Sequence, residues 1–123
     1  MSADIPTASP YQLDEWNGDE GGHWVAYADA YDRMSQPFDR HLLDAAKLSS
    51  ASEILDVGCG CGAFTIAAAH RAHAALGVDV WAPMLGVARR RAREARVTNV
   101  EFVQADAQLY HFEDARFDAV VSP

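Results

Sequence analysis

The sequence has little cysteine, little positive charge and no long apolar run, and each shortage excludes a class of protein. It contains two cysteines in 123 residues, Cys59 and Cys61, with one residue between them. Cysteines this close rarely reach disulfide geometry, so a disulfide-stapled fold is excluded. No second Cys/His cluster completes a zinc site, so we expect no metal. We interpret both cysteines as small residues that fill a tight loop in a reducing compartment.

The charge balance argues against a polyanion-binding module. Ten Lys and Arg residues stand against 18 Asp and Glu residues, which gives a formal net charge of -8 at pH 7. A chain of this sign repels nucleic acid and anionic membranes at long range, so we expect neither as a partner. The one basic run, at residues 89–96, lies on a predicted helix with an apolar face. We interpret it as solvated surface near a helix C-terminus; a phosphate- or RNA-binding face is the alternative.

Targeting signals are also missing from the sequence. The N-terminus has no basic region followed by an apolar stretch, which is the pattern of a signal peptide. No apolar run approaches the roughly 20 residues that a membrane span needs. We therefore expect a cytoplasmic protein without a membrane span.

The first 50 residues predict a leader followed by helices. Residues 1–22 are rich in turn-forming pairs and predict a loose leader. Residues 23–50 predict two amphipathic helices, which we expect Pro37 to separate. Phe38 begins the apolar face of the second helix. The apolar face of the first consists of Trp24, Tyr27, Tyr31 and Met34; its aromatic residues are interpreted as core, with a lid as the alternative.

Residues 51–123 alternate between short apolar strands and helices. The predicted strands are 53–57, 74–79, 100–104 and 117–121, and the predicted helices are 63–72 and 83–96. This alternation is typical of parallel βαβ units, whose right-handed crossovers we expect to place helices on both faces of the sheet. The fold class is therefore α/β with a parallel sheet.

A glycine-rich loop follows the first predicted strand. Gly58, Gly60 and Gly62 permit a sharp turn and let a ligand approach bare backbone at the start of the next helix. With Ala63 the spacing also satisfies the dinucleotide pattern G-x-G-x-x-A. Asp56 favours a ligand with an amino group, because a negative charge is unfavourable beside a pyrophosphate. A cap of the glycine turn is the structural alternative for this residue.

Two further acids follow the next two strands. Asp79 ends the second strand and Asp106 follows the third at the equivalent position. Parallel sheets bind ligands at the carboxyl ends of their strands, so Asp56, Asp79 and Asp106 converge on one edge. That edge suits a ligand with a cationic end, a ribose and a neutral base. Asp79 has little structural reason to stand at a strand end, whereas Asp106 has the alternative role of a helix N-cap.

These motifs, in this order and at this spacing, resemble the class I S-adenosylmethionine-dependent methyltransferases. The segments that carry the resemblance are 56–62, 77–79, 104–107 and 117–121. The segment 79–85 is similar to the small-molecule branch that includes the ubiquinone and menaquinone methyltransferases. The resemblance implies a Rossmann-like sheet with strand order 3-2-1-4 in residues 51–123, the first part of a longer sheet.

The resemblance also implies roles toward S-adenosylmethionine, with S-adenosylhomocysteine as the product. Asp56 aids the loop and the cofactor's amino group, and Asp79 accepts the ribose hydroxyls. Asp106 and the Ala107 N–H face the adenine. The methionine end is supported by the backbone of Gly58, Cys59, Gly60 and Gly62. The residues that flank the adenine are Val80, Trp81, Met84 and Phe112.

We expect methyl transfer to a small-molecule acceptor. No residue is assigned to catalysis: His111 is the nearest candidate for a general base, and a surface histidine is the alternative. A non-catalytic cofactor-binding module and, more distantly, a nicotinamide oxidoreductase are the competing functions. The fourth strand is expected to be an unpaired apolar edge, which indicates a fragment, a truncated product or a homodimer formed by strand pairing.

Overall fold

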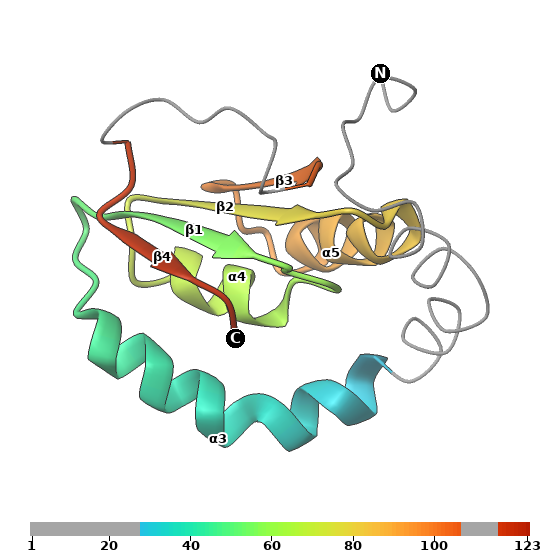
Figure 1. Ribbon diagram of the computed structural model, residues 1–123, viewed down its shortest axis with the longest axis horizontal. Helices are drawn as coiled ribbons and strands as arrows, with labels where there is room; N and C mark the ends of the chain where they lie inside the picture. The colour runs from blue at the N-terminus through green and yellow to red at the C-terminus, as the bar shows by residue number, and fades with distance from the viewer. Residues whose placement is uncertain (1–27, 107–115) are drawn as a thin grey trace.

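Four parallel strands form the centre of the protein in the computed structural model, which describes residues 28–106 and 116–123. The strands are β1 (Glu53–Val57), β2 (Ala74–Asp79), β3 (Val100–Gln104) and β4 (Ala119–Val121). Their order is β3-β2-β1-β4, and each neighbouring pair is parallel (Figure 1). The predicted α/β class and the predicted strand order are both confirmed.

The three longer strands have the bounds that the sequence predicts, and two of them, β1 and β2, are buried on both faces. Ile54 and Leu55 are neighbours in β1 and point to opposite faces, yet they are 0% and 4% exposed. β4 is shorter than the predicted 117–121, and its Val120 is exposed. The register pairs Val57 with Val78, so the carboxyl ends of β1 and β2 lie at the same edge.

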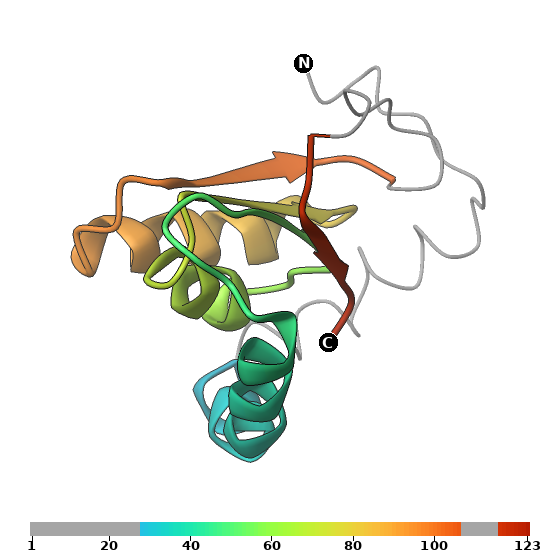
Figure 2. The same cartoon turned by 90° about the vertical axis from the view of Figure 1, so that its left-hand side faces the viewer.

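The crossover helices α4 (Ala63–Ala69) and α5 (Ala82–Glu94) cover the same face of the sheet (Figure 2). The chain moves from β1 to β2 to β3 in one direction, and right-handed crossovers then place both helices on one side. The expectation of helices on both faces is not tested, because most of the connection between β3 and β4 lies outside the described residues. α4 packs through Phe64 and Ala68 on Ile54, and α5 packs through Leu85 and Ala88.

In the described part of the N-terminal region, from residue 28 on, one helix occupies the stretch where the sequence predicts two. α3 (Ala28–Ala46) continues through Pro37, which lies inside it. Proline lacks the N–H that bonds one turn back and usually ends or bends a helix, so its position predicts a break. Here the helix continues on both sides of the proline and follows a curved course past α4 (Figure 1).

The two ends of α3 are attached in different ways. Near its C-terminus, Leu43 is 5% exposed and joins the apolar cluster that contains Ile54 and Phe64. Further toward the N-terminus, Met34 and Phe38 are 73% and 79% exposed. The apolar faces on which the sequence places these two side chains are therefore exposed at both positions. The helix is anchored by its C-terminal half and by polar contacts at its start.

Candidate functional site

The loop between β1 and α4 is held by backbone contacts to β2. Gly58, Gly60 and Gly62 have φ values of +73°, +55° and +86°, a region that residues with a side chain rarely adopt. The N–H groups of Gly58 and Cys59 both donate to the Val78 carbonyl, at 2.8 and 3.0 Å. The loop therefore has a fixed shape that depends on glycine.

The glycines of this loop serve two different purposes. A Cβ at Gly62 would lie 2.7 Å from Ala88 Cβ and 2.9 Å from the Phe102 ring, so glycine is needed here for the loop to pack on α5 and β3. A Cβ at Gly58 would meet no atom within 4 Å. Gly58 thus presents bare backbone to open space, whereas Gly62 lets two elements approach each other.

Asp79 holds the glycine loop to the start of α5. Its Oδ2 accepts a hydrogen bond from the Gly60 N–H at 2.9 Å, and its Oδ1 accepts one from the Trp81 N–H at 3.2 Å. The interpretation that this carboxylate has little structural reason for its position is therefore wrong. A carboxylate accepts about four hydrogen bonds, so both oxygens retain capacity for a ligand.

Asp56 is a buried carboxyl group beneath the loop. It is 1% exposed, and its Oδ2 accepts a hydrogen bond from the Thr65 hydroxyl at 2.6 Å. Its Oδ1 has no hydrogen-bond partner among the described residues. The pKa of Asp56 is raised to about 7, mainly by burial; the Thr65 hydrogen bond lowers it, and the nearby charges of Asp39 and Asp79 contribute to the rise. A buried acceptor without a partner is costly unless a ligand or water supplies a donor.

The third predicted acid lies at the same edge of the sheet. Asp106 follows β3 and is 8% exposed. β3 is joined to β2 up to its last residue, with Gln104 paired to Asp79, and the Ala105 N–H donates to the Asp79 carbonyl at 2.9 Å. Asp56, Asp79 and Asp106 therefore stand at the carboxyl ends of three adjacent strands. Ala107, Phe112 and His111 lie outside the described residues.

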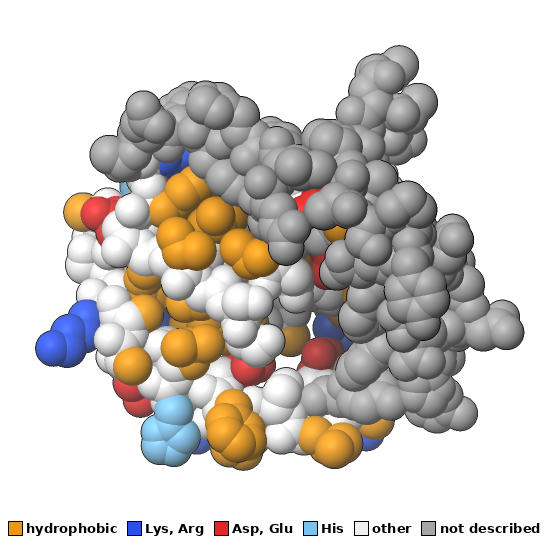
Figure 3. All heavy atoms as spheres, viewed as in Figure 1, with side chains coloured by type: hydrophobic (Ala, Val, Ile, Leu, Met, Phe, Trp, Pro, Cys, Tyr) orange, Lys and Arg blue, Asp and Glu red, His pale blue; other side chains and the backbone are white. Residues whose placement is uncertain are grey.

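A pocket of about 470 Å³ opens between the glycine loop and α3. Figure 3 shows a hollow on this face of the molecule with acidic side chains at its edge. Met84 of α5 and Pro123 complete the wall. No Lys, Arg or His residue lines the pocket among the described parts of the chain. The loop and α4 line it with Asp56, Gly58, Cys59, Gly60, Cys61, Gly62, Ala63 and Phe64, and α3 with Asp32, Met34, Ser35 and Asp39.

The pocket contains some of the predicted site residues and not others. The predicted residues that line it are Asp56, Gly58, Cys59, Gly60, Gly62 and Met84. Asp79, Val80, Trp81 and Asp106 lie along the neighbouring strand ends, outside the pocket lining. Trp81 is the N-cap residue of α5 and is 5% exposed, so its ring is packed into the protein.

Sequence reasoning missed the part of the pocket that α3 provides. Asp32, Ser35 and Asp39 recur at i, i+3 and i+7, a spacing that places them on one face of a continuous helix. The signal was present, but the expected break at Pro37 divided it between two helices.

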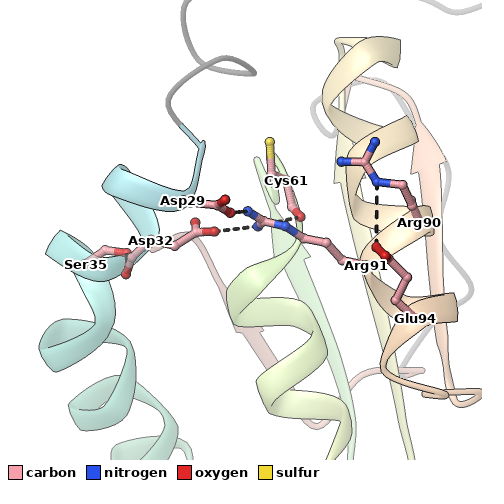
Figure 4. A network of polar contacts seen from close by, with 7 residues as sticks. All are labelled: Asp29, Asp32, Ser35, Cys61, Arg90, Arg91 and Glu94. Carbon is pink, nitrogen blue, oxygen red and sulfur yellow. Dashed lines mark hydrogen bonds and ion pairs between the residues drawn. The ribbon is translucent and has the colours of Figure 1, made fainter.

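Arg91 of α5 joins α3 to the glycine loop (Figure 4). Its guanidinium donates to Asp29 Oδ1 and lies against Asp32 Oδ2, both at 2.5 Å, and it also donates to the Cys61 carbonyl at 3.3 Å. The Arg91 side chain is only 20% exposed. Its neighbour Arg90 points the other way, toward Glu94 (Figure 4). The basic run is therefore not uniformly solvated, because Arg91 makes these contacts and Arg89 donates to the Phe102 carbonyl at 2.7 Å.

The chemistry of the pocket wall is acidic rather than nucleophilic. Cys59 and Cys61 are free cysteines, and burial raises the pKa of both thiols, which keeps them protonated. Within the described residues, no group of His, Cys, Asp or Glu is arranged to hold a metal ion. None of the helices described is both long and apolar enough to cross a membrane.

Fold and site together define a class: an S-adenosylmethionine-dependent methyltransferase domain with a Rossmann-like sheet. The chain belongs to the methyltransferase domain family, which matches residues 54–123. It is 41% identical over 83 residues to a demethylmenaquinone methyltransferase of Thermus thermophilus. The aligned segment covers 66% of this chain and 37% of that protein. It is 31% identical over 98 residues to the aklanonic acid methyltransferase DauC of a Streptomyces species, with coverages of 74% and 44%.

The solved structures agree with this fold. The magnesium protoporphyrin IX methyltransferase of Synechocystis superposes with a TM-score of 0.71 at 19% identity, over 91% of this chain and 56% of that one. The two sequence relatives above are longer than this chain, which spans less than half the length of each.

Proposed function

We propose that this domain binds S-adenosylmethionine at the carboxyl ends of β1, β2 and β3 and takes part in methyl transfer to a small molecule. One observation carries the proposal: a glycine loop of fixed shape and a buried carboxyl group border a pocket. Among the described residues, one oxygen of that carboxyl group is unpaired and every charged residue that lines the pocket is acidic. Such a pocket favours a cation, and S-adenosylmethionine carries a sulfonium and an ammonium group.

The residues present fit the parts of this cofactor. The open backbone at Gly58 leaves room for the methionine end, and Asp56 Oδ1 offers an acceptor for its ammonium group. Asp79 retains acceptor capacity on both oxygens for the two ribose hydroxyls. We assign the adenine side of the cofactor to Asp106 and Ala107. We expect the adenine ring to be flanked by Val80, Trp81 and Met84.

The chemistry of the reaction resides in the cofactor, which when bound supplies a methyl group on a positively charged sulfur. The contribution of the chain is then placement, because alignment of two reactants lowers a barrier by up to roughly 7–11 kcal/mol. The acidic wall stabilises the cationic end, and the loop fixes its position. We assign no general base among the described residues.

A small molecule is the proposed acceptor. The names of both sequence relatives specify small-molecule substrates, demethylmenaquinone and aklanonic acid. The net charge of -8 opposes a nucleic-acid substrate. Apolar side chains at the pocket, Met34, Phe64 and Met84, suit an apolar acceptor.

Self-association through β4 is a separate proposal. Val120 is 63% exposed on this strand, whose described pairing is with β1 alone. Light scattering over a range of protein concentrations tests it. A concentration-independent monomer mass contradicts the proposal.

Titration calorimetry with S-adenosylmethionine, S-adenosylhomocysteine and NAD tests the cofactor assignment. We expect binding of the first two, and NAD binding without either of them would overturn the cofactor assignment.

Asp79→Ala is expected to lower affinity for S-adenosylhomocysteine about 100-fold, because two hydrogen bonds to a charged group are lost. Asp118→Ala, which removes an exposed carboxylate from the opposite end of the sheet, is the control. An unchanged affinity for Asp79→Ala would contradict its ribose role.

A further inference from the structure

The pocket has an acidic wall that does not come from the glycine loop. α3 contributes Asp32 and Asp39, which face the pocket from the side opposite Asp56. These two carboxylates lie outside the 54–123 segment that matches the methyltransferase family. The described lining contains no basic side chain to neutralise them.

The two α3 carboxylates differ in their partners. Asp32 is ion-paired with Arg91 at 2.5 Å, so its charge is compensated within the protein. Asp39 accepts one hydrogen bond, a long one of 3.4 Å from the Ser35 hydroxyl. Of these two pocket-lining carboxylates, Asp39 therefore has more acceptor capacity left for a ligand.

A second observation shows that this region is built for a cationic group. Asp56 is 99% buried, lines the same pocket and has an oxygen without a hydrogen-bond partner among the described residues. Asp39 lies near enough to Asp56 for the two negative charges to repel, which contributes to the raised pKa of Asp56. Two carboxyl groups that repel each other across a pocket are stabilised by a cation between them.

An organic cation fits this arrangement better than a metal ion. No group of three potential ligands is close enough to hold a metal within the described residues. The loop beside Asp56 offers glycine backbone, which lets a flexible organic chain approach closely.

We propose that Asp39 is a specificity residue: its carboxylate, together with Asp56, binds the α-ammonium group of the cofactor's methionine end, so that α3 recognises this group. The inference rests on the proposed function, because it assigns a contact within the same site. Arg91 is the positioning residue for this contact, since it fixes α3 against the loop through Asp29 and Asp32.

The test pairs one substitution with one change in the ligand. Calorimetry compares wild type with Asp39→Asn, using S-adenosylmethionine, S-adenosylhomocysteine and the analogue of the latter without the α-amino group. We expect Asp39→Asn to weaken the binding of S-adenosylhomocysteine about tenfold, which is the usual effect of losing one hydrogen bond to a charged group. We expect the same substitution to leave affinity for the deamino analogue unchanged, which also demonstrates that the variant is folded. Asp44→Asn, an equal charge change on the exposed side of α3, is the control.

Each other outcome overturns the assignment in a recognisable way. Equal losses for both ligands mean that Asp39 acts through the structure and not on the amino group. A loss for S-adenosylmethionine alone would place the carboxylate near the sulfonium. Unchanged affinity for every ligand removes Asp39 from the site but leaves the proposed function standing. A wild-type protein that binds none of these ligands overturns both.

Discussion

The two walls of the pocket are built in different ways. The loop wall is formed by residues 56–62 and is held by backbone hydrogen bonds and by glycines in a narrow range of conformations. The α3 wall is formed by a helix that is held near the pocket by a few side-chain contacts, chiefly those of Arg91. The loop wall is therefore part of the folded core, whereas the α3 wall is docked onto it.

This difference predicts different responses to substitution. A change in the loop wall affects the strands that form the core, so it alters the stability of the whole domain. A change in the α3 contacts alters how firmly one helix is held and leaves the sheet intact. The three experiments below test that contrast.

The largest effect is expected for the buried acid of the loop wall. Asp56 has a folded-state pKa of about 7, above its ordinary value of 3.8, so the folded protein binds the proton more tightly than the unfolded chain. Its stabilising contribution is therefore present below about pH 4 and is lost as the pH rises toward 7. Asp56→Asn removes this dependence. Between pH 4 and pH 7.5, the free energy of unfolding of the variant should therefore rise relative to that of wild type by on the order of 4 kcal/mol.

Urea unfolding at a series of pH values measures this difference. Glu101→Gln, which removes an exposed carboxylate from β3, is the control and is expected to follow wild type. A constant difference between Asp56→Asn and wild type over this pH range would show that Asp56 is ionised in the folded protein. In that case the loop wall is a charged surface and not a buried core.

The second effect separates the two kinds of glycine in the loop. Gly62→Ala places a Cβ 2.7 Å from Ala88 in addition to the cost of a positive φ, so we expect the free energy of unfolding to fall by about 3 kcal/mol. Gly58→Ala has a similar φ and open space, so we expect a loss of about 1 kcal/mol. Chemical denaturation checks both. Equal losses would mean that backbone conformation alone limits the loop.

Much of the loop wall was predictable because its signals are local. Three strands have the predicted bounds, and the glycine spacing places the turn between Asp56 and Ala63. The structural role of Asp79 was not predictable, because its partners Gly60 and Trp81 are fixed only when the loop folds back on β2. The strand-end position is visible in the sequence, but the hydrogen bonds are not.

The α3 wall was not predicted, because its signals conflict or are distant. Pro37 indicates a break, yet α3 continues through it, which places Asp32 and Asp39 on one helix. Arg91 stands in an arginine run that reads as solvated surface. It lies three residues after the buried Ala88, beside the apolar face, and this spacing is the one local sign of its different role.

The smallest effect on global stability is expected for the α3 contacts, and it completes the comparison. Arg91→Ala removes two ion pairs and a bond to the Cys61 carbonyl, and we expect it to lower the free energy of unfolding by about 1 kcal/mol. Amide exchange should accelerate about tenfold in the first turns of α3, because a local opening becomes easier, while β1 and β2 keep their protection.

Arg90→Ala is the matched control for this experiment. Arg90 is the adjacent arginine on the same helix, and its one described ion pair, at 3.8 Å to Glu94, is exposed. Such a pair contributes about 0.3–0.5 kcal/mol, so exchange in α3 should not change. Faster exchange spread equally over α3, β1 and β2 in Arg91→Ala would mean that the helix is part of the core. Unchanged exchange in α3 would mean that the apolar contact at Leu43 is sufficient to hold it, and the pocket would then have two rigid walls.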